Sequence, residues 1–193
     1  MKRVGLDDLM GLPAYEKVRS QFRQEIIEFK KNRRLPVGDR ISLVFENRRT
    51  VVFQIQEMMR AEKIADPDKI REEVDVYNTL IPDSNELSVT LLIEMEEQTK
   101  IREHLLKFLG IDETVYLKIG AHHSIRAMFE KGHSKEDKIS AVQYVPFRLS
   151  SKARDDFIEG QGKILVLIDH PNYQAQAKIW EEMRKSLSQD LME

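Results

Sequence analysis

Apolar side chains recur every three or four residues from residue 13 to 31, which is typical of an amphipathic helix. Pro13 stands at the start of this segment, a position that suits the first turn of a helix. Charged and polar side chains fill the opposite face. The apolar stripe consists of Tyr15, Val18, Phe22, Ile26 and Phe29.

The segment 47–63 fits two patterns. Its first half alternates between apolar and polar residues, as a strand of a hairpin would, but this alternation ends at Gln56. A helical stripe continues through Met59, so the length of the pattern favours a helix with Asn47 as its N-cap. Asp66 and Pro67 then provide the N-cap and the first-turn proline of another helix.

The rest of the chain alternates mainly with a period of two, which indicates strands separated by helices. The residues from 86 to 95 show this pattern most clearly, because every second side chain is apolar. Strands are expected at 40–45, 86–95, 115–119, 141–149 and 164–168, and helices at 101–109, 150–160 and 171–187.

These elements predict an α+β fold, with a mixed or mainly antiparallel sheet of about five strands and helices packed on it. The strand at 164–168 is apolar throughout, so it is the one strand expected to be buried on both faces. No linker or repeat divides the sequence. We therefore expect a single α+β domain over 1–193, with a mainly helical part at 1–80 and a strand-rich part at 86–193.

Composition favours a cytoplasmic protein. A content of 41% hydrophobic and 33% charged residues is typical of a globular chain. The absence of cysteine excludes disulfides, thiolate nucleophiles and Cys-ligated zinc or iron–sulfur centres, and it agrees with a reducing compartment. No apolar stretch is long enough for a membrane span, and charges interrupt the N-terminus before a signal peptide could form.

The net charge of −2 is unevenly distributed, with a basic excess in the first 60 residues and an acidic excess at 61–113. A basic segment can bind nucleic acid, but here no aromatic residues are interleaved for base stacking. Nucleic acid is therefore the least favoured partner. The basic residues in question are Lys30, Lys31, Arg33, Arg34, Arg48 and Arg49.

No nucleotide-binding or hydrolase motif is present. The sequence contains neither G-x-G-x-x-G nor G-x-x-x-x-G-K-[ST], which excludes Rossmann and P-loop sites. It also lacks the G-x-S-x-G of a nucleophile elbow. No particular cofactor is indicated.

Polar side chains on the helix expected at 47–63 are one set of site candidates. Arg48 and Glu62 fall at the two ends of its apolar stripe, and Gln54 and Glu57 lie in the neighbouring strip. One interpretation makes Glu57 a solvated partner of Arg60. The other makes Glu57 a general base or a metal ligand beside Gln54.

Histidines are the second set of candidates. His122 and His123 follow a strand in an expected loop, and His133 lies further along in "EKGHSKED". His170 adjoins Asp169, which could fix its tautomer for use as a base or a metal ligand. None of the four makes a recognised metal spacing, so the alternative is an exposed loop and a turn residue.

The strand expected at 141–149 is a candidate for contact with a partner. Tyr144 and Phe147 point to opposite faces of this strand, and Pro146 cannot donate a hydrogen bond to a neighbour. Such a strand belongs at an edge or a bulge of the sheet. An edge strand could pair with another protein or with a second copy of the chain, giving a homo-oligomer.

Four stretches, "FENRRTVVFQIQEMMRAEKI", "YNTLIPDSNELSVTLLIEM", "AVQYVPFRLS" and "HPNY", resemble a bacterial domain-of-unknown-function family over nearly the whole chain. That family is often encoded beside rubrerythrin and iron–sulfur oxidoreductase genes, so the resemblance implies a supporting role in redox or peroxide metabolism. It assigns no catalytic residue. Its polar motif residues, which would line one groove if their segments pack together, are Glu46, Asn47, Arg48, Gln54, Glu57, Arg60, Glu62, Tyr77, Asn78, Glu86 and Thr90.

Three functions remain open from the sequence. The favoured one is a non-catalytic accessory or interaction protein, which partners a redox system. The second is an enzyme or a ligand-binding protein, and the third is a nucleic-acid binder. The groove of the second would be built from Arg48, Gln54, Glu57, Tyr77 and Asn78, with His170 as a further member.

Overall fold

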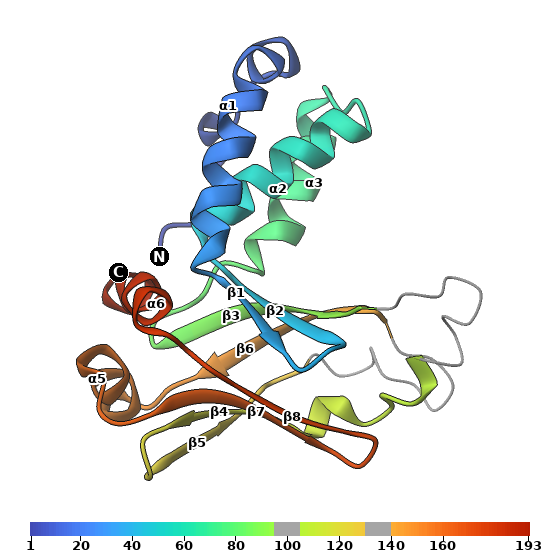
Figure 1. Ribbon diagram of the computed structural model, residues 1–193. Coiled ribbons are helices and arrows are strands. Elements are labelled where there is room, and N and C mark those ends of the chain that lie inside the picture. Colours follow the sequence, from blue (N-terminus) through green and yellow to red (C-terminus); the bar gives the residue numbers. More distant parts are fainter. Residues whose placement is uncertain (95–104, 130–139) are drawn as a thin grey trace.

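The computed structural model describes residues 1–94, 105–129 and 140–193, and its strands form two antiparallel sheets (Figure 1). The first sheet has the order β1-β2-β3-β6, and the second has the order β5-β4-β7-β8. This arrangement confirms the α+β class and the antiparallel pairing. The first sheet contains β1 (Arg34–Val37), β2 (Ile41–Glu46), β3 (Glu86–Ile93) and β6 (Val142–Arg148). The second contains β4 (Val115–Ile119), β5 (His123–Arg126), β7 (Ile164–His170) and β8 (Tyr173–Lys178).

The two sheets enclose the main hydrophobic core. Leu43, Leu91 and Phe147 come from the first sheet, and Leu117 and Val166 come from the second. Their burial follows from the period of two, because alternate side chains of each strand turn toward the other sheet.

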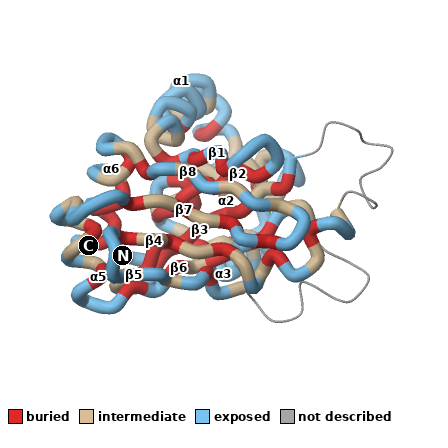
Figure 2. Tube along the Cα trace, turned by 60° about the horizontal axis from the view of Figure 1, so that its bottom comes forward, coloured by how far each residue is buried: buried red, intermediate tan, exposed pale blue. Residues whose placement is uncertain are grey.

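Three helices stand on the side of the first sheet that faces away from the second sheet, and we call them the helical arm (Figure 1). They are α1 (Leu12–Lys31), α2 (Arg48–Ala61) and α3 (Pro67–Asn78). A second hydrophobic cluster holds α2 and α3 together and includes Val51, Ile55 and Val74. The outer parts of the arm are largely exposed, whereas buried residues follow the strands (Figure 2). The short helix η1 (Leu6–Asp8) packs against α3.

The helical interpretation of 47–63 is confirmed. The Asn47 side chain accepts hydrogen bonds from the backbone N–H groups of Arg49 and Thr50, as an N-cap should. Asp66 caps α3 in the same way. The N-cap satisfies N–H groups that have no partner within the helix, so the sequence fixes where each of these helices begins.

The helix expected at 171–187 is wrong in its first half. Residues 171 and 172 form a turn, and the chain then returns as β8, paired antiparallel with β7. Tyr173, Ala175 and Ala177 alternate with exposed residues along this strand. The C-terminal helix is α6 (Glu181–Met192), which packs with α5 (Ser151–Glu159).

The strand buried on both faces is also not the expected one. In β7, Leu165 and Leu167 are only partly buried, because nothing among the described residues covers the outside of the second sheet there. β2 is buried along its whole length, and β3 almost so, because the helical arm covers their outer side. Polar residues in these two strands are therefore enclosed.

The remaining expectations concern the edge of the first sheet, the other strands and the helix at 101–109. β6 is an edge of the first sheet, which agrees with Pro146, and Tyr144 and Phe147 do face opposite ways. β1 and β5 were not expected as strands, and His123 belongs to β5 rather than to a loop. Residues 101–104 of the helix expected at 101–109 lie outside the described residues; 105 and 106 are helical, 107–110 form turns, and the 3-10 helix η3 (Ile111–Glu113) follows. None of the described helices is both long enough and apolar enough to cross a membrane.

Candidate functional site

The face of the first sheet that is turned toward the helical arm is rich in buried polar side chains, and we call it the outer face. Ser42 and Glu46 reach it from β2, and Glu86, Ser88 and Thr90 reach it from β3. The residues that alternate with them along β2 and β3 point into the core between the sheets. The pairing of the two strands therefore brings these polar side chains together on one face. Because buried polar groups need hydrogen-bond partners, their pairing shows which of them are structural.

Glu46 is the centre of this polar face. It is the last residue of β2, and it lies four residues before Thr50 and eight before Gln54, so all three share one side of the strand-to-helix junction. Gln54 Nε2 donates to Glu46 Oε2 over 2.9 Å, and the Thr50 hydroxyl donates to the same oxygen. The Thr90 hydroxyl donates to Glu46 Oε1 over 2.8 Å.

These partners of Glu46 are neutral. Within the described part of the chain, no Lys, Arg or His side chain forms an ion pair with its carboxylate, although the residue is only 3% exposed. The negative charge of Glu46 nevertheless acts on its surroundings, since burial and then this charge raise the pKa of Tyr144. A buried carboxylate held only by neutral donors is an unusual arrangement, because burial of a charge is costly without compensation.

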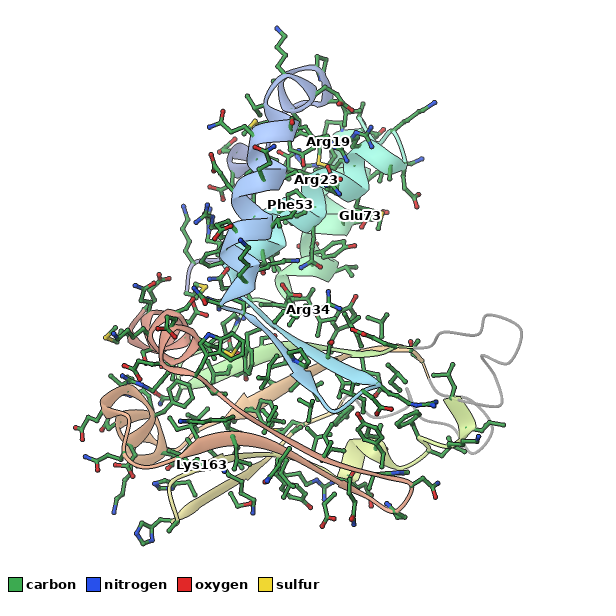
Figure 3. The ribbon with its side chains drawn as sticks, viewed as in Figure 1. Arg19, Arg23, Arg34, Phe53, Glu73 and Lys163 are labelled. Carbon is green, nitrogen blue, oxygen red and sulfur yellow. The ribbon has the colours of Figure 1, made fainter. Side chains whose placement is uncertain are left out.

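Glu46 borders a cavity of about 670 Å³ between the helical arm and the outer face. We call it the Glu46 cavity. Its floor is the buried part of the lining, which consists of Val44, Glu46 and Thr90 on the sheet. Its rim is formed by the more exposed side chains of α1 and β1, several of them basic; Figure 3 shows Arg34 at the level where the arm meets the sheet. The lining residues are Ile27, Lys30, Lys31, Arg34, Pro36, Val44, Glu46, Gln54, Thr90 and Leu92.

Two of the basic side chains already have acidic partners. Lys31 pairs with Glu28 over 2.5 Å, and Arg34 pairs with Glu94 over 2.6 Å. Among the described residues, Lys30 forms no ion pair, and it is only partly exposed. Lys30 is therefore the cation of this cavity whose charge is least compensated.

Glu57, a candidate from the sequence, lies elsewhere. It joins α1 to α2, accepting hydrogen bonds from the Tyr15 hydroxyl over 2.7 Å and from Nε and Nη2 of Arg19, each over 2.8 Å. The Arg19 hydrogen bond holds the pKa of Glu57 below its usual value. Arg60 pairs with Glu16 instead of with Glu57. Figure 3 shows Arg19 among the helices of the arm, well away from Arg34.

Arg48 and Asn78 hold the N-terminal segment in place. Arg48 Nη2 pairs with Asp8 over 2.6 Å, and the Arg48 backbone N–H contacts the sulfur of Met1. The Asn78 side chain exchanges two hydrogen bonds with the backbone of Val4, at 2.8 and 3.0 Å. Arg48 lines a separate cavity of about 500 Å³, so it does not meet Gln54 in one groove.

The two other helical candidates have unlike surroundings. Glu62 is the exposed C-cap residue of α2. Tyr77 is partly buried on α3, where burial and then the nearby Tyr144 raise its pKa. Of Arg48, Gln54, Glu57, Tyr77 and Asn78, Gln54 alone lines the Glu46 cavity, and from the wider set of motif residues Glu46 and Thr90 join it.

The histidines also separate in space. The ring of His170 is buried, with Nε2 bonded to the Leu109 carbonyl over 2.8 Å and Nδ1 accepting from the Asn172 N–H over 3.2 Å. His123 Nε2 lies 2.7 Å from Asp156 Oδ2, which links β5 to α5. His122 is exposed, and His133 lies outside the described residues. In the described ranges, no three His, Asp or Glu side chains are grouped so that they could hold a metal.

Sequence reasoning did not single out the residues that frame the Glu46 cavity. Glu46 and Thr90 appeared only among the motif residues, and Lys30 only as part of a basic cluster. The available signal was polar residues at alternate positions of two apolar strands, Ser42 and Glu46 in one and Ser88 and Thr90 in the other. In antiparallel neighbours, such residues meet on one face.

Comparisons with known proteins agree with this fold. The chain is 34% identical to a protein of unknown function from Burkholderia pseudomallei K96243 whose crystal structure is known. The match covers 98% of this chain and 100% of that one, with a TM-score of 0.92. No match was found among curated proteins. Residues 3–191 match the family described as "Protein of unknown function (DUF3501)", and the chain therefore belongs to that family.

Proposed function

We propose that this protein is a non-catalytic accessory protein of the cytoplasm, which acts by binding and uses the Glu46 cavity as its binding site. The observation that carries the proposal is a buried carboxylate that borders an open cavity and whose partners in the described part of the chain are all neutral. The system it serves is a redox or peroxide pathway, an assignment that rests on the family resemblance of the sequence motifs.

The contacts of the other candidates support binding rather than catalysis. A general base must reach its substrate. The Glu57 carboxylate instead accepts three hydrogen bonds from Tyr15 and Arg19, which lie within the helical arm. His170 uses both ring nitrogens within the fold. These side chains stabilise the structure, whereas Glu46 adjoins a space that a ligand can fill.

The edges of the first sheet offer a second way to bind, through a protein partner. β6 is an edge strand with Tyr144 exposed on it, and a redox partner or a second copy of the chain could add a strand there. Part of this edge is already covered, because the Met128 N–H donates to the Pro146 carbonyl over 2.9 Å. The cavity is therefore the better supported site.

Nucleic acid remains the least favoured ligand. Lys31 and Arg34 are paired with carboxylates, and Arg33 is buried, so the basic cluster does not present a continuous positive surface. Binding to phosphate backbones depends on several such contacts at once.

Ligand binding can be tested with a set of metabolites that includes amino acids, amines, carboxylates, sugars and nucleotides. Thermal shift would identify candidate ligands, and calorimetry would confirm saturable binding. The matched variant is Leu92→Trp, which fills the cavity from β3. We expect at least one compound to bind the wild type and to lose affinity for the variant. The proposal is overturned if no compound binds saturably, or if a correctly folded Leu92→Trp protein binds all of them equally well.

A further inference from the structure

We propose that the Glu46 cavity binds a small ω-amino acid, that is, a molecule with an ammonium group at one end, a hydrocarbon chain in the middle and a carboxylate at the other end. This inference rests on the proposed function, and it specifies the chemistry of the ligand. Three features of the cavity carry it: the floor, the apolar lining and the rim.

The carboxylate on the floor of the cavity favours a cationic group. A carboxylate offers about four hydrogen-bonding positions, and Glu46 uses three of them, for Thr50, Gln54 and Thr90. Among the described residues, Oε1 accepts only from Thr90, so it can accept one further donor from the cavity. An ammonium group supplies both that donor and the direct ion pair that the described residues do not form with Glu46.

The apolar side chains of the lining favour a hydrocarbon. Of the apolar lining residues, Val44 is buried on the floor beside Glu46, Leu92 is partly buried, and Ile27 and Pro36 are exposed at the rim. Burial of the ligand's methylene groups against Val44 and Leu92 is favourable. A ligand whose two charges were adjacent would instead place a charge against this apolar surface.

The basic side chains at the rim of the cavity favour an anionic group. Lys30 borders the cavity without an ion pair among the described residues, and Lys31 and Arg34 stand beside it. A carboxylate at the far end of the ligand would pair with Lys30 and keep its remaining oxygen positions in water. The cavity is negative at its floor and positive at its rim. An ω-amino acid that enters with its ammonium group first therefore places each of its charges beside an opposite one.

Lys30 could also turn inward and neutralise Glu46 directly. Such an internal pair would leave the cavity with no preference for an amine, so ligands with and without an amine would bind alike. The affinity of matched compounds therefore separates an internal ion pair from a ligand site.

The test is calorimetry of the whole chain with γ-aminobutyrate, ε-aminocaproate and ω-aminocaprylate, which differ only in length. The matched compounds are hexylamine, which lacks the anion, caproate, which lacks the cation, and norleucine, an isomer of ε-aminocaproate with adjacent charges. We expect one ω-amino acid to bind at least tenfold more tightly than its matched compounds, because each charged contact contributes to affinity.

Glu46→Gln and Lys30→Met should each weaken that binding about tenfold or more, and Lys30→Met should leave the affinity for hexylamine unchanged. Glu86→Gln is the control, because Glu86 is a buried carboxylate on the same sheet face but pairs with Arg148 at the opposite end of β3. Circular dichroism would establish that each variant is folded.

The inference is overturned if no ω-amino acid binds more tightly than its matched compounds, or if Glu46→Gln and Glu86→Gln weaken binding equally. Its failure differs from failure of the proposed function. If the metabolite screen finds a different ligand that Leu92→Trp excludes, the cavity remains a binding site and only the ligand class is wrong.

Discussion

The hydroxyl of Tyr15 donates a 2.7 Å hydrogen bond to Oε1 of Glu57, and this contact fastens α1 to α2. Arg19 completes the arrangement with two hydrogen bonds to the same carboxylate. Tyr15 is fully buried, and its hydroxyl has no access to bulk water. Burial, and then the hydrogen bond to Glu57, raise the pKa of Tyr15, so the hydroxyl remains a donor at neutral pH.

Replacement of Glu57 by Ala should lower the free energy of unfolding by about 1 kcal/mol, because it leaves the Tyr15 hydroxyl without its acceptor in a partly screened site. It should leave ligand binding unchanged. Urea unfolding measures the first effect and calorimetry the second. Glu62→Ala, at the exposed end of the same helix, is the control and should change stability by less than about 0.5 kcal/mol. Loss of binding with intact stability would assign Glu57 to a functional site.

The stabilising effect of Glu57 should depend on pH. Because the Arg19 hydrogen bond lowers the pKa of Glu57 in the folded state below the ordinary value of 4.5, ionised Glu57 stabilises the fold above that pH. This contribution is lost as the pH falls through the lowered pKa. The wild type should thus be more stable than Glu57→Gln near neutral pH, and the free energies of unfolding of the two proteins should converge in acid. Parallel pH profiles would contradict this assignment.

Arg33 and Asp190 form a buried ion pair that joins the start of the first sheet to the last helix. Asn47 also donates to Asp190, over 3.0 Å. Burial raises the pKa of Asp190 despite the opposing charge of Arg33. Asp190→Ala should destabilise the fold by about 3 to 5 kcal/mol, because it leaves the Arg33 charge buried and unpaired.

The control for this pair is the double variant Arg33→Met with Asp190→Leu. It removes both charges together, so it should be more stable than either single variant in urea unfolding. Simple additivity of the two single effects would show that the ion pair does not couple the helix to the sheet.

The helices of the arm could be predicted because their signals are local. Asn47 and Asp66 cap helices through contacts within three residues, and the apolar stripe of α2 extends over its full length. The region after Pro171 could not be predicted in the same way. Tyr173 and Ala177 fit both a helix and a strand, and pairing with β7 decided in favour of the strand.

The Glu46 cavity depended on contacts that the sequence does not show. Lys30, Pro36, Gln54 and Leu92 come from four different elements, and only the packing of the arm on the first sheet brings them around Glu46. Gln54 was predicted because the helix projection is local. Arg48 was predicted to join it, but the two side chains leave α2 in different directions.

The histidines lead to a prediction about metal content. Because both ring nitrogens of His170 are engaged inside the fold, we expect no stoichiometric iron, manganese or zinc bound through this residue. Elemental analysis of untagged protein, with His170→Asn and with His122→Ala combined with His123→Ala, measures this directly. A stoichiometric metal that either variant removes would instead make the histidines ligands.

The last prediction concerns the junction of the two sheets, where the Tyr173 hydroxyl donates to the Val37 carbonyl over 2.7 Å and accepts from the Arg40 N–H over 3.1 Å. Gly38 lies inside this turn with a φ of +77°, and a Cβ there would collide with the Tyr173 hydroxyl. Gly38→Ala should therefore cost at least about 1 to 2 kcal/mol from the backbone alone, and Tyr173→Phe about 1 kcal/mol from its lost hydrogen bonds. Gly5→Ala is the control, because its nearest neighbour lies at an ordinary 3.8 Å. If adding Tyr173→Ala restores the free energy of unfolding that Gly38→Ala removes, the collision with Tyr173 is the main cost. If it does not, the main cost is the left-handed backbone conformation of Gly38.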